Sequence, residues 1–206
     1  MLKLLLLFAH LLGTSLALGA IVATDIRLLG KLADDRVRIA PPNPFVMRLI
    51  TLALLVLYAT GAARVWLALG DDPEFLSNPK FQAKLILVAL LSVNALVLHH
   101  ITFPGLARGR RVARWKLSDF MRVAVPVSLS NCLWMYCAFL GIARPWNHAV
   151  SLGFVLGTAA WLCAATLAGI TTLLVIAAQD RTDITEPGWI DALKRRLGAL
   201  ATALRA

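Results

Sequence analysis

Apolar residues occur along this chain in long uninterrupted runs rather than in short alternating patterns. Five runs are each about twenty residues or longer, which is the length an α-helix needs to cross the apolar core of a membrane. They span about 3–23, 45–69, 82–103, 123–143 and 150–178. The pattern predicts an all-α integral membrane protein, with a bundle of five transmembrane helices over residues 1–178 and a separate tail over 179–206.

Prolines and asparagines mark the expected ends of these helices. Asn43-Pro44 and Asn78-Pro79 each place a capping side chain before a proline at the first helical position. Pro104-Gly105 and Pro145 follow the third and fourth runs, where proline commonly ends a helix. We therefore expect the third helix to end before Pro104.

Basic residues gather on one side of the predicted membrane. The chain has 21 Lys and Arg against 11 Asp and Glu. Sixteen basic residues fall on one side: five in segment 24–48, six in segment 104–122 and five in the tail. The N-terminus and the other two connections carry four. Because basic loops stay in the cytoplasm, this bias predicts a bacterial inner-membrane protein with its N-terminus outside and its C-terminus inside. It favours lipid rather than nucleic acid as the partner of the excess charge.

The first run permits two readings. The letters "SLALGA" resemble the small-residue cleavage site of a secretory signal. Cleavage would require Lys3 to stay inside while the basic segment 24–48 crosses the membrane, which the charge bias opposes. We therefore expect residues 3–23 to form a retained first helix.

The tail has apolar residues at helical spacing. Thr185-Glu186-Pro187 can begin a helix, and its border carries Lys194, Arg195 and Arg196. The apolar side would consist of Trp189, Leu193, Leu197, Leu200 and Leu204. This predicts an amphipathic helix on the cytoplasmic leaflet, or alternatively a surface that docks on a protein partner. Small residues at 153, 157, 160 and 164 also allow close contact with another helix, including that of a second copy.

No acidic residue falls inside an apolar run as bounded above. Proton-coupled carriers commonly relay protons through buried carboxylates, so this absence disfavours a proton-driven carrier. The chain has three cysteines, all inside the runs and without a CxxC pair, so we expect them to pack as small apolar residues.

Histidine is the remaining candidate ligand. His10 lies on a side of the first run that is small and polar, which favours contact with other helices. A hydrogen bond across a helix interface explains this pattern, and axial ligation of haem iron is the alternative. Tyr58, Thr60 and Asn131 are polar groups expected at a similar depth.

Four further residues are candidates for cofactor binding: Arg64, Lys84, His99 and His148. Arg64 and Lys84 could pair with haem propionates or another anion, or extend to lipid phosphates. His10 lies roughly 10 Å below the outer boundary, and His99 lies about 22 Å along its helix from Lys84, so their depths differ by about 10 Å. One haem held between His10 and His99 is therefore disfavoured. His148, in the outer loop "RPWNHAV", is closer in depth to His10.

Two segments carry a family resemblance. "AHLLGTSLALGAIVATDIRLLG" has an early histidine, small residues and a basic end, and "KLILVALLSVNALVLHH" opens with lysine and closes with histidine. Together they resemble a broad group of small polytopic bacterial membrane proteins that includes the haem-binding membrane protoporphyrinogen oxidases and the copper-resistance protein D family. The resemblance implies that His10 and Lys84 match the first-helix histidine and third-helix lysine of the oxidases, and hence that haem b binds. In the oxidases the arginine lies nearer that histidine than Arg27 does to His10.

Three classes of function remain open. The first is a haem b protein for electron transfer or porphyrin chemistry, with His10 as its leading ligand. The second is a non-catalytic accessory or scaffold subunit. The third is a carrier or copper-handling protein, which the lack of intramembrane carboxylates and methionine clusters disfavours. The chain has no P-loop, GxSxG elbow, HExxH site or dinucleotide fingerprint, so no catalytic residue is assigned.

Overall fold

The computed structural model describes residues 1–32, 38–71, 73–109, 112–179 and 189–203. Within these ranges the chain forms helices and short connectors, with no β-strand. Five stretches are long and apolar enough to cross a membrane: α1 (Leu2–Leu32), α2 (Pro44–Asp71), α3 (Pro79–Val97) with its continuation to Leu106, α5 (Leu117–Ile142) and α6 (Leu152–Gln179). The predicted all-α fold, with five helices long and apolar enough to cross a membrane, is confirmed.

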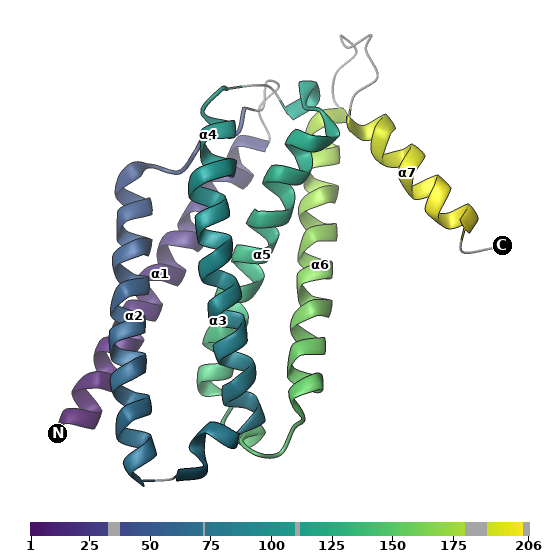
Figure 1. Cartoon of the computed structure of the whole chain (residues 1–206). Helices are drawn as coiled ribbons and strands as arrows, with labels where there is room; N and C mark the ends of the chain where they lie inside the picture. Colours follow the sequence, from purple (N-terminus) through teal and green to yellow (C-terminus); the bar gives the residue numbers. More distant parts are fainter. Residues whose placement is uncertain (33–37, 72, 110–111, 180–188, 204–206) are drawn as a thin grey trace.

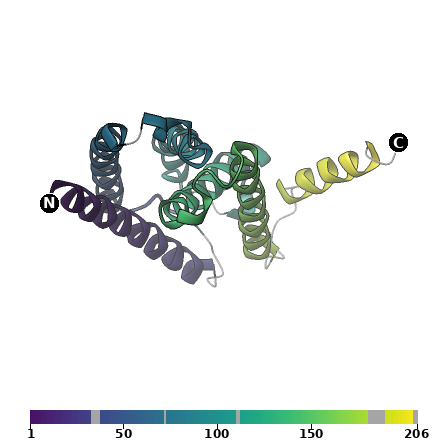
Figure 2. The same cartoon turned by 90° about the horizontal axis from the view of Figure 1, so that it is seen from below.

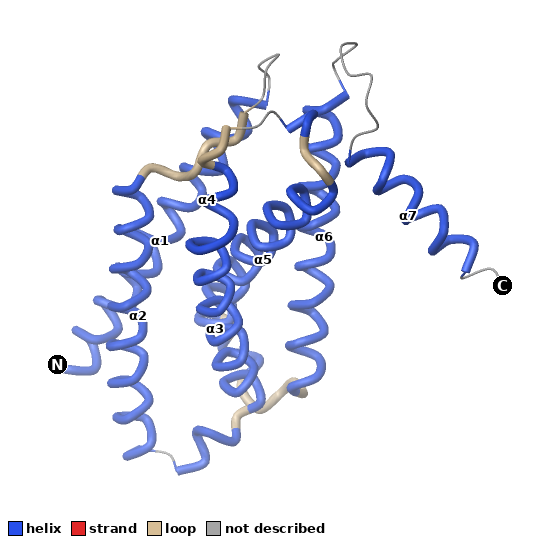
Figure 3. Tube along the Cα trace, turned by 45° about the horizontal axis from the view of Figure 1, so that its top comes forward, coloured by secondary structure: helices blue, strands red, loops and turns tan. Residues whose placement is uncertain are grey.

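Consecutive spans run in opposite directions (Figure 1). The N-terminus and the described connector residues 73–78 and 143–151 lie at the lower end of the bundle in that view. Residues 38–43, 107–109 and 112–116 lie at the upper end. Among the spans, α1 packs along α2, and α5 packs along both α3 and α6. Figure 3 shows that the connectors are confined to these two ends.

Short helical turns complete the chain. Turns of 3-10 helix lie at Pro73–Ser77, Val112–Arg114 and Arg144–Trp146, and α4 covers Phe103–Leu106. The last described helix, α7 (Trp189–Ala203), projects away from the bundle (Figure 2).

The asparagine–proline pairs begin two helices as predicted. The side-chain oxygen of Asn78 accepts a hydrogen bond from the Lys80 backbone N–H at 3.1 Å. The side-chain oxygen of Asn43 accepts one from the Phe45 N–H at 2.8 Å. Each pair satisfies a backbone donor that has no partner within the helix, which fixes where the helix starts.

Two helices are longer than the apolar runs indicated. The first helix continues to Leu32 rather than ending near residue 23, and α5 begins at Leu117 rather than near 123. Residues 24–32 are mostly good helix formers and contain no proline, so polarity there ends the apolar run without ending the helix. Asp25 therefore lies within a helix that can span the membrane.

The prediction that the third helix ends before Pro104 is wrong. A π-helical turn at Leu98–Thr102 leads directly into α4, and the Phe103 N–H bonds the Leu98 carbonyl five residues earlier. Proline lacks an N–H, and its ring collides with the carbonyl four residues before it in a regular helix. A wider turn just before the proline lets the chain continue in the same direction.

A second proline, Pro126, lies inside α5. It leaves the Arg122 carbonyl without its usual helical donor. Thr102, from the π-helical turn, donates its hydroxyl to that carbonyl at 2.8 Å. The buried Asn94 side chain of α3 donates to the Pro126 carbonyl at 2.9 Å. Because unsatisfied backbone groups are costly in lipid, these bonds tie the irregular parts of α3 and α5 together.

The helix α7 is anchored by its first residue. The indole ring of Trp189 is buried and stacks on Phe120, with ring centroids 4.4 Å apart, and its Nε1 donates to the Val112 carbonyl at 3.1 Å. Trp189 thus belongs to the protein core, whereas Leu197 is exposed. The predicted helix start at Thr185-Glu186-Pro187, the Leu200 side chain and Leu204 lie outside the described part of the chain.

Candidate functional site

His10 of α1 is held by a residue of α2. Its Nδ1 lies 2.8 Å from the Thr60 hydroxyl oxygen. That hydroxyl donates its only hydrogen to the Val56 carbonyl at 2.6 Å, so it must accept from the histidine. The proton therefore resides on Nδ1. The Nε2 atom is left with a free lone pair when the ring is neutral, and no hydrogen bond to it occurs in the described part of the chain.

Small residues bring α1 and α2 close together around this hydrogen bond. A Cβ atom on Gly13 would lie 3.5 Å from the Ala53 carbonyl oxygen and from the Leu57 side chain. A Cβ atom on Gly61 would lie 3.8 Å from the His10 ring. The small side of the first run thus meets another helix, as predicted, and the contact leaves little free space.

Two cations lie near His10. Lys84 of α3 is half-buried, with its Nζ 3.6 Å from the position of a Cβ on Gly141 of α5. Arg64 of α2, Lys84 and His10 lie close enough to interact through their charges. We call His10, Thr60, Arg64 and Lys84 the His10 cluster. Among the described residues no carboxylate forms an ion pair with Arg64 or Lys84, and such a group suits an anionic ligand.

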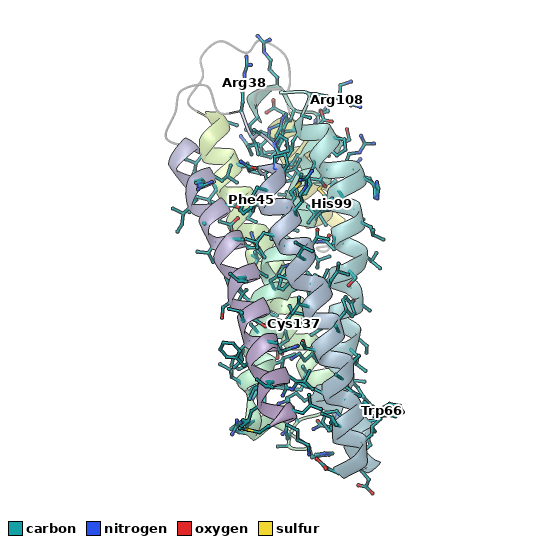
Figure 4. All side chains as sticks on the ribbon, turned by 90° about the vertical axis from the view of Figure 1, so that its left-hand side faces the viewer. Arg38, Phe45, Trp66, His99, Arg108 and Cys137 are labelled. Carbon is teal, nitrogen blue, oxygen red and sulfur yellow. The ribbon has the colours of Figure 1, made fainter. Side chains whose placement is uncertain are left out.

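His99 and His148 do not join this cluster. In Figure 4, His99 lies toward the end that carries Arg38 and Arg108, well above Cys137. The His99 Nδ1 donates to the Ala95 carbonyl at 3.2 Å, and its ring packs edge-on against Phe103. His148 is exposed on the connector at the lower end, with a positive φ of 53°. No group of three or more His, Cys, Asp or Glu residues in the described chain is arranged to hold a metal ion.

A second polar region lies at the upper end of the bundle, around a cavity of about 460 Å³. The sequence did not predict it. The cavity is lined by residues of α1, α2, α3, α5 and α6 and is bordered by Asp25, His99 and Asn131. We call it the Asp25 cavity. Its other walls are mainly apolar, and they include the described connector residues 39–43.

The side chain of Asp25 is half-buried within a helix that can span the membrane. Asp25 lies outside the predicted apolar run at 3–23, but the helix continues past that run and includes it. Asn131, which was predicted near the depth of His10, borders the same cavity as Asp25. The missed signal is the periodic series Ala17, Ile21, Asp25 and Leu28, which continues one helix face beyond the apolar run.

Two tyrosines, Tyr58 of the predicted polar groups and Tyr136, form contacts between helices. Tyr58 of α2 hydrogen-bonds the Ser92 hydroxyl of α3. The Tyr136 hydroxyl of α5 donates to the Val155 carbonyl of α6 at 3.0 Å. A second cavity of about 570 Å³ between α5 and α6 is lined mainly by apolar and weakly polar side chains and includes no charged residue. The two tyrosines therefore bond neighbouring helices rather than converging on one site.

Comparisons of the chain with protein-family models, with curated proteins and with solved structures found no match.

Proposed function

We propose that this chain is a multi-pass protein of the bacterial inner membrane, with its N-terminus outside and its C-terminus in the cytoplasm. The sixteen-to-four distribution of Lys and Arg supports this orientation. Arg38 and Arg108 lie together at the upper end of the bundle, which would then be the cytoplasmic end (Figure 4). The exposed Leu197 and the neighbouring basic residues of α7 are suited to the surface of the same leaflet.

We further propose that the protein binds haem b at the His10 cluster. The observation that carries this proposal is the hydrogen bond from His10 Nδ1 to Thr60. Histidines that ligate metals commonly donate their other ring N–H to a protein acceptor, which fixes the ring and leaves the second nitrogen for the metal. The resemblance of the first and third helices to haem-binding membrane oxidases points to the same residue.

Each member of the cluster has a role in this proposal. His10 would hold the iron through Nε2, and Thr60 would keep the imidazole in the required tautomer. Arg64 and Lys84 would offset the negative charge of the propionate groups. Haem b, when bound, supplies one-electron chemistry. Neither of the two cavities described above includes His10, so the proposal rests on the ligand set rather than on a preformed pocket.

The absorption spectrum of the protein purified in detergent from haem-replete cells tests this proposal. We expect a Soret band that shifts on reduction with dithionite. His10→Ala should abolish or shift this band, whereas the matched variant His100→Ala, at the exposed upper end, should leave it unchanged. Thr60→Val should weaken haem retention by about tenfold or more, because the ring loses its acceptor. A colourless wild-type preparation, or an unchanged spectrum in His10→Ala, would refute the proposal.

A second candidate is an accessory membrane subunit that docks a partner through α7. The helix is attached to the bundle through the stack of Trp189 on Phe120, and the remainder extends outward with Leu197 exposed. Leu197→Glu should release a co-purifying partner without disturbing the anchor. Arg196→Glu, a neighbouring exposed position, is the control for added charge. Undiminished co-purification in Leu197→Glu would count against this role.

A further inference from the structure

The Asp25 cavity has the size and composition of a ligand site. Its volume of about 460 Å³ lies within the range of small-molecule pockets, which are mostly apolar with a few convergent polar groups. Leu54, Leu91 and Val127 contribute apolar walls from three helices, and Phe103 and Trp134 contribute aromatic rings. The cavity also borders the π-helical turn and the segment of α5 around Pro126, where the backbone is irregular.

The polar groups around this cavity have hydrogen-bond acceptors to spare. His99 uses its Nδ1–H on the Ala95 carbonyl, so the neutral ring offers Nε2 as an acceptor. Thr24 uses its hydroxyl hydrogen on the Ala20 carbonyl at 2.8 Å, so its oxygen offers only lone pairs. Asn131 and Asp25 border the same space, and the two oxygens of an ionised carboxylate can each accept more than one hydrogen bond.

Asp25 forms no ion pair within the part of the chain that the structure describes. Arg27 borders the same space but is exposed, and residues two positions apart on a helix do not face each other. A carboxylate inside a membrane span ordinarily faces a cavity or a partner cation.

We propose that the Asp25 cavity binds an amphiphilic organic ammonium ion. The N–H donors of its head group would bond the Asp25 carboxylate and His99 Nε2, and its apolar body would lie against the Leu54, Leu91 and Val127 walls. The rings of Phe103 and Trp134 suit this occupant because aromatic faces attract cations. The ammonium group could belong to a free amine or to the head group of an aminophospholipid. This proposal is independent of haem binding, which concerns the other end of α1.

Binding of radiolabelled dodecylammonium to the full chain tests the proposal. The protein would be held in phosphatidylcholine nanodiscs, whose quaternary head groups carry no N–H donors, with empty nanodiscs as the background. We expect saturable binding, and we expect dodecanol to compete at least about tenfold more weakly, because it lacks the charge.

Variants then locate the binding. Asp25→Asn should weaken dodecylammonium binding by about tenfold or more, and Asp191→Asn, the same change on the exposed face of α7, should not. Ala95→Phe, which fills the cavity and leaves Asp25 in place, should also abolish binding, so the test survives if Asp25→Asn misfolds. Equal binding by wild type, Asp25→Asn and Ala95→Phe would overturn the proposal, as would equal affinity for dodecanol.

Competition with phosphatidylethanolamine distinguishes the two sources of the ammonium group. If this lipid displaces dodecylammonium from the wild type, the natural ligand is a lipid head group. If it does not, the ligand is a free amine. Both results require that dodecylammonium binds the wild type and depends on Asp25, and failure of that requirement overturns the proposal for both sources.

Discussion

The same helix carries two polar regions that differ in packing and in charge. His10 and Asp25 are fifteen residues apart on α1, which corresponds to about 22 Å along the helix. Around His10, small residues bring α1 and α2 together, and the imidazole is satisfied by Thr60. Around Asp25 the helices enclose a cavity of about 460 Å³, and the polar groups border free space.

The difference follows from the regularity of the neighbouring helices. Near His10 the packed segments of α1 and α2 are regular and contain glycine, so their backbones approach closely. Near Asp25 the third and fifth helices contain a π-helical turn and Pro126, and residues next to these irregular segments line the cavity. Irregular backbone at membrane depth is tolerated where it is buried in protein or lines a cavity.

The two regions also favour ligands of opposite charge. The His10 cluster contains two cations and one imidazole, and no described carboxylate pairs with Arg64 or Lys84. The lining of the Asp25 cavity includes one carboxylate, the exposed Arg27 and several acceptor groups. The two regions therefore differ in the charged groups that they offer, and the packing of each region can be tested separately.

Enlarging one alanine in each region should give the largest difference in stability. Ala17 is fully buried in the packed core, so Ala17→Phe should destabilise the protein by about 2–3 kcal/mol. Ala95→Phe, which extends into the cavity, should cost less than about 0.5 kcal/mol or stabilise the fold. The free energy of unfolding of the two variants and the wild type, measured in mixed detergent micelles of identical composition, would give both values. Equal destabilisation would show that the space near Asp25 is absent.

A smaller difference should separate two threonines. Thr60→Val removes the acceptor of the His10 N–H and should destabilise the protein by about 1–2 kcal/mol, because a buried donor loses its partner. Thr24→Val removes only a bond to the Ala20 carbonyl of the same helix and should change stability by a few tenths of a kcal/mol. The same unfolding assay checks this pair. If only Thr24→Val lowered the free energy of unfolding strongly, the region near Asp25 would be the more tightly packed one, which would contradict the account.

The smallest effect is expected between α2 and α3. Tyr58→Phe removes the hydrogen bond to Ser92 at an exposed position and should cost about 0.6 kcal/mol, the average for such bonds in membrane proteins. If Tyr58→Phe lowered the free energy of unfolding more than Thr60→Val does, the main polar contact of α2 would be made by Tyr58 rather than by Thr60 with His10. His10→Phe in the Tyr58→Phe background would then show whether the two losses add.

The sequence predicted the regular parts of this fold well. Apolar runs of membrane-spanning length identified all five spans, and Asn43 and Asn78 identified two helix starts, because these signals depend only on neighbouring residues. The small residues beside His10 correctly indicated a helix contact. Their partner, Thr60, is fifty residues away, and such pairing depends on how two whole helices pack.

The open region could not be predicted in the same way. The hydropathy pattern predicted that the first helix ends before Asp25, but the helix continues to Leu32 because most residues after Asp25 favour helix. Pro104 has the local signature of a helix end, yet a π-helical turn accommodates it. The cavity is lined by residues from several helices, including those next to the π-helical turn and Pro126, so no local pattern predicts it.

Cysteine modification at position 95 tests the central claim most directly. The three native cysteines would first be replaced by alanine, and Ala95→Cys would be treated with methanethiosulfonate reagents that carry either an ammonium or a sulfonate group. We predict reaction with the ammonium reagent about tenfold faster or more, loss of that preference in Asp25→Asn, and no reaction of the matched variant Ala17→Cys. Equal rates with the two reagents, or equal reactivity at positions 17 and 95, would contradict the account of one packed and one open, acceptor-lined region.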